Sequence, residues 1–384
     1  MKRIRLLDIL RGFAIIGTLG TNIWVFAAVT NENNDYFTGA TDWWLNMDDF
    51  ISSLFLFLVN GKFLSMLTIM FGIGLEIKRQ QAIRNDWTWP GIYIWGSFLL
   101  FIDGILHYVF VIEVDVLMSY GVTAIIVAYI AKLPHKKMMR WFYAMGTFHL
   151  FNITALTVIL LGADTNFSIT SASQVYASGT WIEQVWYRIE NIGVLRTEAI
   201  FIIPQNICLF IIGILLMRKK IFTLDSGINV KTRNKFLTIG FIAIPLNLLY
   251  FLPSEALFFP VRYVFAPLMA LFYMGLFSWL FEKYKQSRLF YFFEKIGKMA
   301  LSNYMLQNIV ASCIFYGWGL GIGLQELSAP AIISIWLLIV LFMMAFSHFW
   351  LRHFSAGPIE WAWKLLTNIP ARKRKQSPKM NVNS

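Results

Sequence analysis

Residues 90–112 read PGIYIWGSFLLFIDGILHYVFVI and decide the fold class of this chain. The stretch has the roughly 20 apolar residues that a helix needs to cross the hydrocarbon core of a bilayer. It nevertheless contains Asp103 and His107, one helical turn apart. Ionisable side chains are costly in lipid, so within membrane helices they normally face the bundle interior and mark a chemical or transport site. The stretch therefore predicts a membrane-spanning helix with a functional face.

Apolar segments of this kind recur along the whole chain. Of the 384 residues, 58% are hydrophobic and 14% are charged, which leaves too little polar surface for a soluble globule. About ten transmembrane helices are predicted, so the fold is an all-α polytopic integral membrane helix bundle. Residues 1–370 form a single transmembrane domain in this interpretation, followed by a basic disordered cytoplasmic tail at 371–384. The predicted helices cover approximately residues 9–29, 50–77, 90–112, 114–131, 141–161, 194–217, 236–252, 261–281, 299–316 and 331–351.

Basic residues gather in alternate connections between these segments. Lys and Arg accumulate in the cytoplasmic loops of membrane proteins, so both termini are expected in the cytoplasm, in a multi-pass protein of a bacterial cell membrane. Basic inner loops facing anionic lipid also explain the net charge of +12 without a nucleic-acid partner. The sequence leaves the oligomeric state open, with a homodimer as one option. Of the 33 Lys and Arg residues, those predicted away from the cytoplasmic side are Lys62, Arg188, Arg196 and Arg262.

Two features interrupt the regular spacing of helices. The second segment contains Asn60-Gly61-Lys62, and a broken helix at membrane depth is tolerated only where it is buried in protein or lines a wet cavity. The connection at 162–191 is long and polar, and its 181–187 stretch is suited to lie along the membrane interface. A lid over an outward-facing site and a simple connector both fit this connection.

The first span carries a polar stripe made of Asp8, Arg11 and Asn22, which project from one side of a helix. The stripe would run from the inner surface to the middle of the membrane. An alternative assigns Asp8 and Arg11 to a local ion pair and Asn22 to a hydrogen bond between helices.

The third span and the start of the fourth bring together Asp103, His107 and Asp115. A carboxylate that accepts one imidazole N–H fixes the tautomer and raises the basicity of the other ring nitrogen. His107, oriented by Asp103 or Asp115, is therefore a candidate general base that deprotonates a hydroxyl or an amine. A purely structural hydrogen bond between helices remains the alternative.

Other polar residues within the spans are candidate substrate contacts. Asn303 and Gln307 form a pair four residues apart in the ninth segment. Arg196 and Arg262 stand at outer helix ends, where each could hold an anionic group or extend its side chain to the headgroups. Both cysteines, Cys208 and Cys313, lie inside spans, so neither a disulfide nor a metal site is predicted.

The sequence resembles the bacterial YeiB/YxaH-like membrane proteins over nearly its whole length. The stretches that carry the resemblance are LLDILRGFAIIGTLGTNI (6–23), GKFLSMLTIMFGIGLEIKR (61–79), DGILHYVFVIEVDVLMSYG (103–121), IGKMALSNYMLQNIVASCIFYGWGLGIG (296–323) and SAGPIEWAWKLLT (355–367). That family is placed near the transmembrane acyltransferases similar to heparan-α-glucosaminide N-acetyltransferase. These enzymes share the LD-x-x-RG opening followed by an Asn, which Asp8, Arg11, Gly12 and Asn22 match here.

The resemblance implies acyl transfer from cytoplasmic acyl-CoA, acetyl-CoA in the first place, to a small-molecule, sugar or glycan acceptor across the bilayer. No permanently bound cofactor is implied. The heparan enzymes also have a histidine shortly after their Asn, whereas residues 23–35 contain none here. His107, which with Asp115 matches a pattern of the YeiB-like proteins, is the expected substitute base.

The resulting hypothesis is a membrane acyltransferase. Asn22 or Asn303 would stabilise the oxyanion. Two alternatives remain: a proton-coupled transporter or flippase with Asp103, His107 and Asp115 as a proton relay, and a non-catalytic membrane scaffold. In the acyltransferase, the residues that would receive the CoA phosphates and the thioester are Arg11, Asn22, Lys62, Lys78, Arg79 and Arg84.

Overall fold

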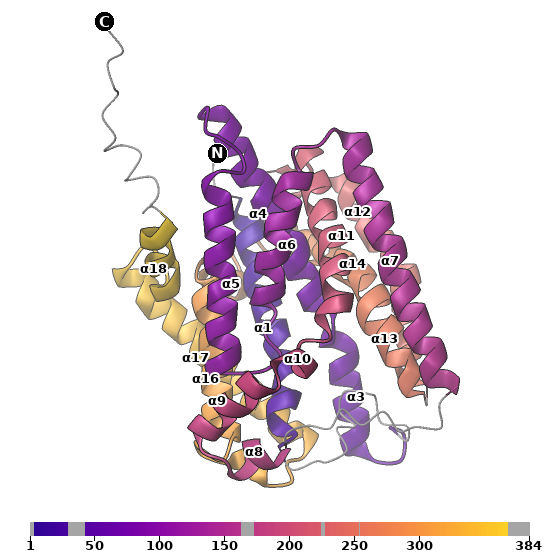
Figure 1. Cartoon of the computed structure of the whole chain (residues 1–384), viewed down its shortest axis with the longest axis vertical. Coiled ribbons are helices and arrows are strands. Elements are labelled where there is room, and N and C mark those ends of the chain that lie inside the picture. The colour runs from indigo at the N-terminus through magenta and orange to yellow at the C-terminus, as the bar shows by residue number, and fades with distance from the viewer. Residues whose placement is uncertain (1–3, 30–42, 163–172, 224–226, 253, 368–384) are drawn as a thin grey trace, which may run out of the picture.

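Long helices make up the bundle in the computed structural model, which describes residues 4–29, 43–162, 173–223, 227–252 and 254–367 (Figure 1). The longer helices are α1 (Arg5–Ala27), α3 (Met47–Val59), α4 (Lys62–Arg84), α5 (Ile92–Phe110), α6 (Leu117–Ile130), α7 (His135–Gly162), α11 (Ala199–Arg218), α12 (Val230–Leu248), α14 (Ala266–Lys283), α16 (Ala300–Phe315) and α17 (Ala329–His353). Short helices are α8 (Ser173–Ser178), α9 (Trp181–Glu190), α10 (Ile192–Leu195), α13 (Phe258–Pro260), α15 (Arg288–Lys298) and α18 (Pro358–Thr367). The remaining elements are the 3₁₀ turns η1 (Leu249–Phe251), η2 (Glu255–Leu257) and η4 (Ile322–Leu324), the π turn η3 (Val261–Phe265), and an antiparallel pair of β1 (Phe222–Thr223) with β2 (Gly227–Ile228).

The predicted all-α membrane bundle is confirmed. Eight helices in the described part of the chain are long and apolar enough to cross a bilayer. Each of the ten predicted segments is helical, but α6 and α16 have only 14 and 16 residues. At 1.5 Å per residue they extend about 21 and 24 Å, less than the hydrocarbon thickness of ~30 Å. The number of spans and the cytoplasmic position of the termini stay predictions, and the predicted tail at 371–384 lies outside the described residues.

The second predicted segment is broken where the sequence placed the interruption. Helix α3 ends at Val59 and α4 begins at Lys62. Gly61 between them has a φ of 75°, a left-handed conformation that glycine adopts without the Cβ clash of other residues. A side chain there would also meet the backbone oxygen of Arg262 at 2.7 Å. The Asn-Gly pair therefore permits both the break and the close approach of the chain that leads into α14.

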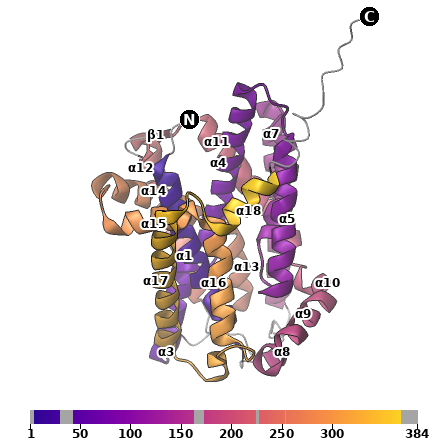
Figure 2. The ribbon, with the colours of Figure 1, turned by 90° about the vertical axis from the view of Figure 1, so that its left-hand side faces the viewer.

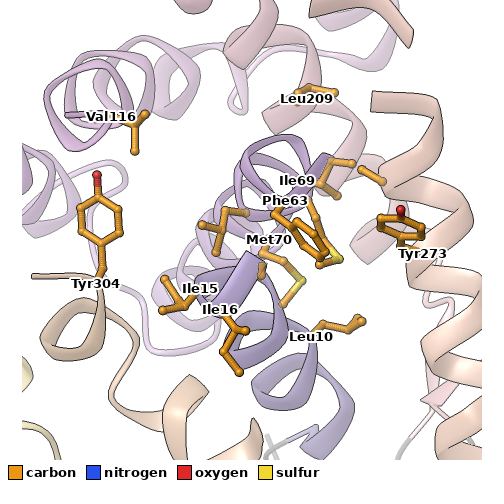
Figure 3. Packing of buried hydrophobic residues seen from close by; sticks show 14 of the residues in the cluster. Leu10, Ile15, Ile16, Phe63, Ile69, Met70, Val116, Leu209, Tyr273 and Tyr304 are labelled. Carbon is orange, nitrogen blue, oxygen red and sulfur yellow. The ribbon is translucent and has the colours of Figure 1, made fainter. Parts of the chain in front are cut away.

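Helix α1 forms the centre of the bundle, because apolar and small residues cover nearly all of its circumference. Figure 3 shows Leu10 and Ile16 of α1 beside Phe63 and Met70 of α4 in the buried cluster. In a bilayer the hydrophobic effect does not drive helices together, because lipid tails are as apolar as the side chains. Dispersion and close packing stabilise such contacts instead. This central helix is the scaffold against which the candidate site is built.

Glycines allow α1 and α15 to touch through their backbones. A Cβ added at Gly12 would lie 1.9 Å from the carbonyl oxygen of Phe293, and one at Gly297 would lie 1.8 Å from that of Asp8. Both separations are far below van der Waals contact. The pair fixes the amphipathic α15 across the N-terminal end of α1.

Replacing Gly12 by alanine should therefore destabilise the protein by about 2 kcal/mol, since overpacking of a tight contact costs about 1–3 kcal/mol. Gly74→Ala in α4 is the matched control, because nothing lies within 4 Å of a Cβ at that position. There, the better helix propensity of alanine should give a neutral or stabilising change of up to ~1 kcal/mol. Unfolding of both variants in lipid nanodiscs measures the difference. Equal stability of the two would contradict the close contact.

The C-terminal helix α18 packs back onto the bundle beside α5 (Figure 2). The indole N–H of Trp95 in α5 donates to the carbonyl of Leu366 in α18 over 3.0 Å. Glu360 of α18 accepts the backbone N–H groups of Leu301 and Ser302 at 2.8 and 3.2 Å, so its carboxylate caps the first turn of α16. This cap anchors one end of the helix that carries Tyr304 and Asn308.

Candidate functional site

A buried polar chain joins α5, the connection at 111–116, α16 and α1. His107 Nδ1 lies 3.0 Å from Asp115 Oδ1, and His107 Nε2 lies 3.2 Å from Asn308 Nδ2. Asn22 Nδ2 in turn donates to Asn308 Oδ1 over 3.3 Å. All four side chains are at least nine-tenths buried. This polar chain of hydrogen-bonded side chains therefore links Asn22 and His107, the two residues that the sequence singled out separately.

The donors and acceptors in this chain determine the state of the imidazole. The Asn308 amide that faces His107 accepts from Asn22 through its oxygen, so its nitrogen donates to Nε2. Nε2 is then an acceptor and Nδ1 carries the proton that is donated to the Asp115 carboxylate. This is the tautomer of a general base whose reactive nitrogen is Nε2.

Further contacts hold Asp115 in place. Its Oδ2 accepts the backbone N–H of Met118 at 3.0 Å, which caps the start of α6. The hydroxyl of Tyr304 in α16 donates to Oδ1 over 3.4 Å. Arg196, near the start of α11, donates to the backbone oxygen of Asp115 over 2.6 Å and to Ser119 Oγ over 3.4 Å. Besides His107, the carboxylate is thus held by α6 and α16, while Arg196 holds the backbone of Asp115.

A narrow cavity of about 60 Å³ borders this chain. By size it has room for a few water molecules or one small oxyanion and not for a sugar ring. It is lined by Asn22, Asp115 and Tyr304, whereas His107 lies behind them. Other polar lining residues are Thr21, Ser65, Thr68, Tyr120, Glu198, Gln205, Asn206, Arg262 and Tyr263.

Of the two predicted orienting carboxylates, Asp115 is the one that contacts His107, and Asp103 makes no hydrogen bond to His107. Its carboxyl group lies near Trp363 of α18 and close enough to Asp115 for the two carboxylates to repel each other. Two side chains four positions apart on a helix differ in direction by about 40° around the helix axis. Helix α18 packs against α5 on the side of Asp103. Asp115, brought back by the connection after α5, occupies the place beside His107.

The polar stripe of α1 is divided between two ends of the molecule. Arg11 pairs with Asp8 at 3.3 Å, as the alternative interpretation proposed, near the N-terminal end of α1 where α15 crosses. Asn22 lies 11 residues further, about 16 Å along the helix. Asp8 and Arg11 are therefore outside the polar chain around His107.

The two amides predicted in α16 are likewise not beside His107. Asn303 donates to Ser347 Oγ of α17 at 2.9 Å, and Gln307 donates to Thr18 Oγ of α1 at 3.4 Å. Both connect helices, so Asn303 is not a candidate oxyanion donor. Asn308 is the residue of this helix that reaches the imidazole. Its position in an apolar segment indicates that Asn308 is a buried amide. The sequence does not indicate that its partner is His107, 201 residues away.

Lys62 and Arg262 meet at the break between α3 and α4. The Arg262 guanidinium donates to Asn60 Oδ1, and lies 3.9 Å from a Glu198 carboxylate oxygen. Lys62 lies close enough to Arg262 for the two charges to repel each other. The predicted grouping of Lys62 with Lys78, Arg79 and Arg84 is not formed, because Arg79 is 17 residues, or about 25 Å, further along α4.

Helices α8 and α9 cross the end of the bundle near the site (Figure 1). Arg188 of α9 donates to the carbonyl oxygens of Val109 and Val111 at 2.9 and 3.5 Å, and the Tyr176 hydroxyl donates to Glu113 at 2.6 Å. Burial raises the pKa of Glu113, against the opposing effects of the Tyr176 hydrogen bond and of Arg188. These contacts attach the segment to the C-terminal end of α5 and to the 111–116 connection. They fit both a lid and a fixed cover.

Comparisons with known proteins give relatives over almost the full chain. The chain is 24% identical to the uncharacterised protein YxaH of Bacillus subtilis (strain 168), with 96% of this chain and 95% of the relative covered. It is 26% identical to the uncharacterised protein YeiB of Escherichia coli (strain K12), with 96% and 97% covered. Residues 216–370 match the family model described as a protein of unknown function, DUF418. No solved structure gives a significant match.

These relatives agree with the resemblance that the sequence motifs carry, and their names assign no activity. The relation to acyltransferases is not part of these matches. With eight helices in the described residues that are long and apolar enough to cross a bilayer, the chain is a membrane protein that is similar over nearly its whole length to the bacterial proteins YxaH and YeiB.

Proposed function

We propose that this protein transfers an acyl group, acetyl in the first place, from cytoplasmic acyl-CoA to a sugar or envelope acceptor on the outer side of a bacterial cell membrane. The observation that carries the proposal is the directed chain from Asn22 through Asn308 and His107 to Asp115. It has the base, the orienting carboxylate and the amide donors that acyl transfer uses.

In the proposed reaction, His107 Nε2 takes the proton of the acceptor hydroxyl or amine. The acceptor atom forms a bond to the thioester carbonyl carbon, and the C–S bond breaks. The CoA thiolate then takes the proton back from the imidazolium, which Asp115 stabilises. Each proton and each electron pair is accounted for without a further reactant.

The amides have a double role in this scheme. In the present arrangement Asn308 Nδ2 donates a hydrogen bond to His107 Nε2. The acceptor must therefore displace this amide before the imidazole acts as a base. The same movement releases Asn22 Nδ2 from Asn308 Oδ1. Asn22, which lines the cavity, is then available to donate to the oxyanion that forms on the thioester carbonyl.

The position of the site determines how deeply the thioester of CoA must enter the protein. Asn22 lies 17 residues from Arg5, about 26 Å along α1, so the thioester has to enter deeply from the cytoplasmic side. Arg11 keeps a third of its side chain exposed near the inner end of α1, and we propose that it contacts a CoA phosphate. A wider opening than the present cavity is required for the acceptor.

The test uses purified protein in lipid vesicles with acetyl-CoA on the cytoplasmic face and an extract of envelope sugars on the other. Release of free CoA thiol that depends on the extract and proceeds without an ion gradient supports acyl transfer. Absence of acetyl-CoA binding and of thiol release with every acceptor fraction would reject it. The broken helix beside the cavity is also typical of transporters, so solute flux that requires a pH gradient would support that second function.

A further inference from the structure

We infer that α9 lies in the membrane–water boundary, with Ile182, Trp186 and Ile189 among the lipid headgroups and the adjoining part of the acyl chains. The partner that this surface fits is the phospholipid bilayer itself, and the contact fixes the depth of the candidate site in the membrane. The inference rests on the packing of α9 and does not depend on acyl transfer.

The first observation is that one side of α9 is fixed to the protein. Gln184 and Arg188, one turn apart, are 0% and 1% exposed. Arg188 donates to the backbone oxygens of Val109 and Val111, where α5 ends. Rotation of α9 about its axis would break these bonds. The protein therefore determines the direction in which each of the other sides of α9 faces.

The second observation is a separation of apolar and acidic side chains on the sides that remain. Ile182, Trp186 and Ile189 are 61%, 59% and 41% exposed. With about 100° per residue, they point within roughly 60° of one another around the helix axis. Glu183 and Glu190 are exposed on the adjoining side. Helix α9 thus presents one side suited to lipid and one suited to water, the pattern of a helix that lies in the plane of the interface.

The third observation is the apolar surface of α5 beside α9, which lies oblique to the end of α5 (Figure 1). Trp181 begins α9, and its ring stacks on Phe110 with 5.8 Å between the ring centroids. Its indole N–H donates to the backbone oxygen of Phe110 over 3.0 Å. Phe110 and Leu106, one turn apart on this candidate membrane span, are 43% and 48% exposed. The apolar surfaces of α5 and α9 therefore meet at Trp181, and lipid that covers the first reaches the second.

The residue types select the bilayer as the partner. Trp is enriched where a membrane meets water, because its ring combines an apolar body with a polar N–H group. A bilayer that covers α5 as far as Phe110 has its headgroups at the level of Trp181, which contacts Phe110. Trp186 then lies at the same boundary, and the carboxylates of Glu183 and Glu190 face water.

The depth of His107 follows from this contact. His107 is three residues before Phe110, which is about 5 Å along α5. With α9 in the boundary, the imidazole and its partner Asp115 lie within about one helical turn of that boundary. The candidate site is then close to one face of the bilayer and not at its centre.

The test locates spin labels by electron paramagnetic resonance in phosphatidylcholine vesicles. Molecular oxygen concentrates in lipid and a nickel chelate stays in water, so the ratio of their collision rates with the label reports its depth. Each label is attached to a single cysteine in a Cys208→Ser, Cys313→Ser background. Ile182→Cys tests the apolar side of α9, and Glu190→Cys is the control on the acidic side of the same helix. Phe151→Cys, at an exposed position in the middle of α7, is the reference for the hydrocarbon core.

We expect the oxygen-to-nickel ratio at Ile182→Cys to exceed that at Glu190→Cys several-fold and to stay below that at Phe151→Cys. Ile189→Cys, on the same side of α9 as Ile182, should give the ratio of Ile182→Cys. It also replaces Ile182→Cys in the comparison if that variant does not fold.

Two results would overturn the inference. Equal access of the nickel chelate to the labels at Ile182→Cys and Glu190→Cys would place the apolar side of α9 in water. Low access of both reagents to the label at Ile182→Cys would show that protein covers this side, for example a second copy of this chain. Neither result involves acetyl-CoA or turnover, so the test separates this surface from the proposed reaction.

Discussion

Replacing His107 by alanine is expected to lower the rate of acyl transfer by about 10²–10⁴-fold, the usual contribution of a general base. In the directed chain the amides of Asn22 and Asn308 cannot act as bases, and the Asp115 carboxylate already accepts from His107 Nδ1, so the imidazole Nε2 is the proposed proton acceptor. Binding of acetyl-CoA should be retained, because His107 lies behind the cavity wall. Thiol release and calorimetric binding, measured on the same preparation, separate these two effects.

Two further variants decide whether His107 has a chemical or a structural role. His107→Gln keeps an amide that can hydrogen-bond to Asp115 but cannot act as a base, so it should fold normally and remain inactive. His353→Ala, at the exposed end of α17, should leave both folding and transfer unchanged. Full activity of His107→Gln would remove His107 from the mechanism. Loss of the folded state in His107→Ala alone would point to a structural hydrogen bond instead.

The second large effect is on stability and involves Glu76 in the C-terminal half of α4. Its carboxylate is 1% exposed and accepts from Arg79, Gln80 and Arg218, the last at 3.1 Å from α11. Arg79 and Arg218 also donate to the same backbone oxygen, that of Ala131 after α6. Glu76 therefore separates two guanidinium groups and connects three helices.

Glu76→Ala should destabilise the protein by about 3 kcal/mol, the lower end of the range for removing one partner of a buried ion pair. The lower end applies because the two arginine side chains are about a quarter exposed. Glu76→Gln, which keeps an acceptor oxygen, should lose less. The stability of each variant is measured by unfolding in detergent. Glu190→Ala, which changes an exposed glutamate of α9, is the control. Equal stability of Glu76→Ala and Glu190→Ala would show that the network is not needed.

Several features of the fold could be read from the sequence because their causes are local. The long apolar segments predict membrane helices, because about 20 apolar residues cross the hydrocarbon core and a helix satisfies its own backbone hydrogen bonds in lipid. The Asn60-Gly61 pair predicted the break between α3 and α4, because glycine alone readily takes the left-handed conformation seen there. The ion pair of Asp8 with Arg11 follows in the same way from helix geometry at a spacing of three residues.

The members of the candidate site were decided by the tertiary structure. The sequence selected His107 and Asn22, but their connection depends on Asn308, 201 residues from His107. It also left Asp103 and Asp115 as equal partners, and only the packing of α18 against α5 and the path of the 111–116 connection placed Asp115 beside the imidazole. Lys62 and Arg262 meet for a similar reason, across helices far apart in the chain. Local periodicity determines which side chains share one helix face, whereas the packing of helices determines which faces meet, and that information is distributed over the whole bundle.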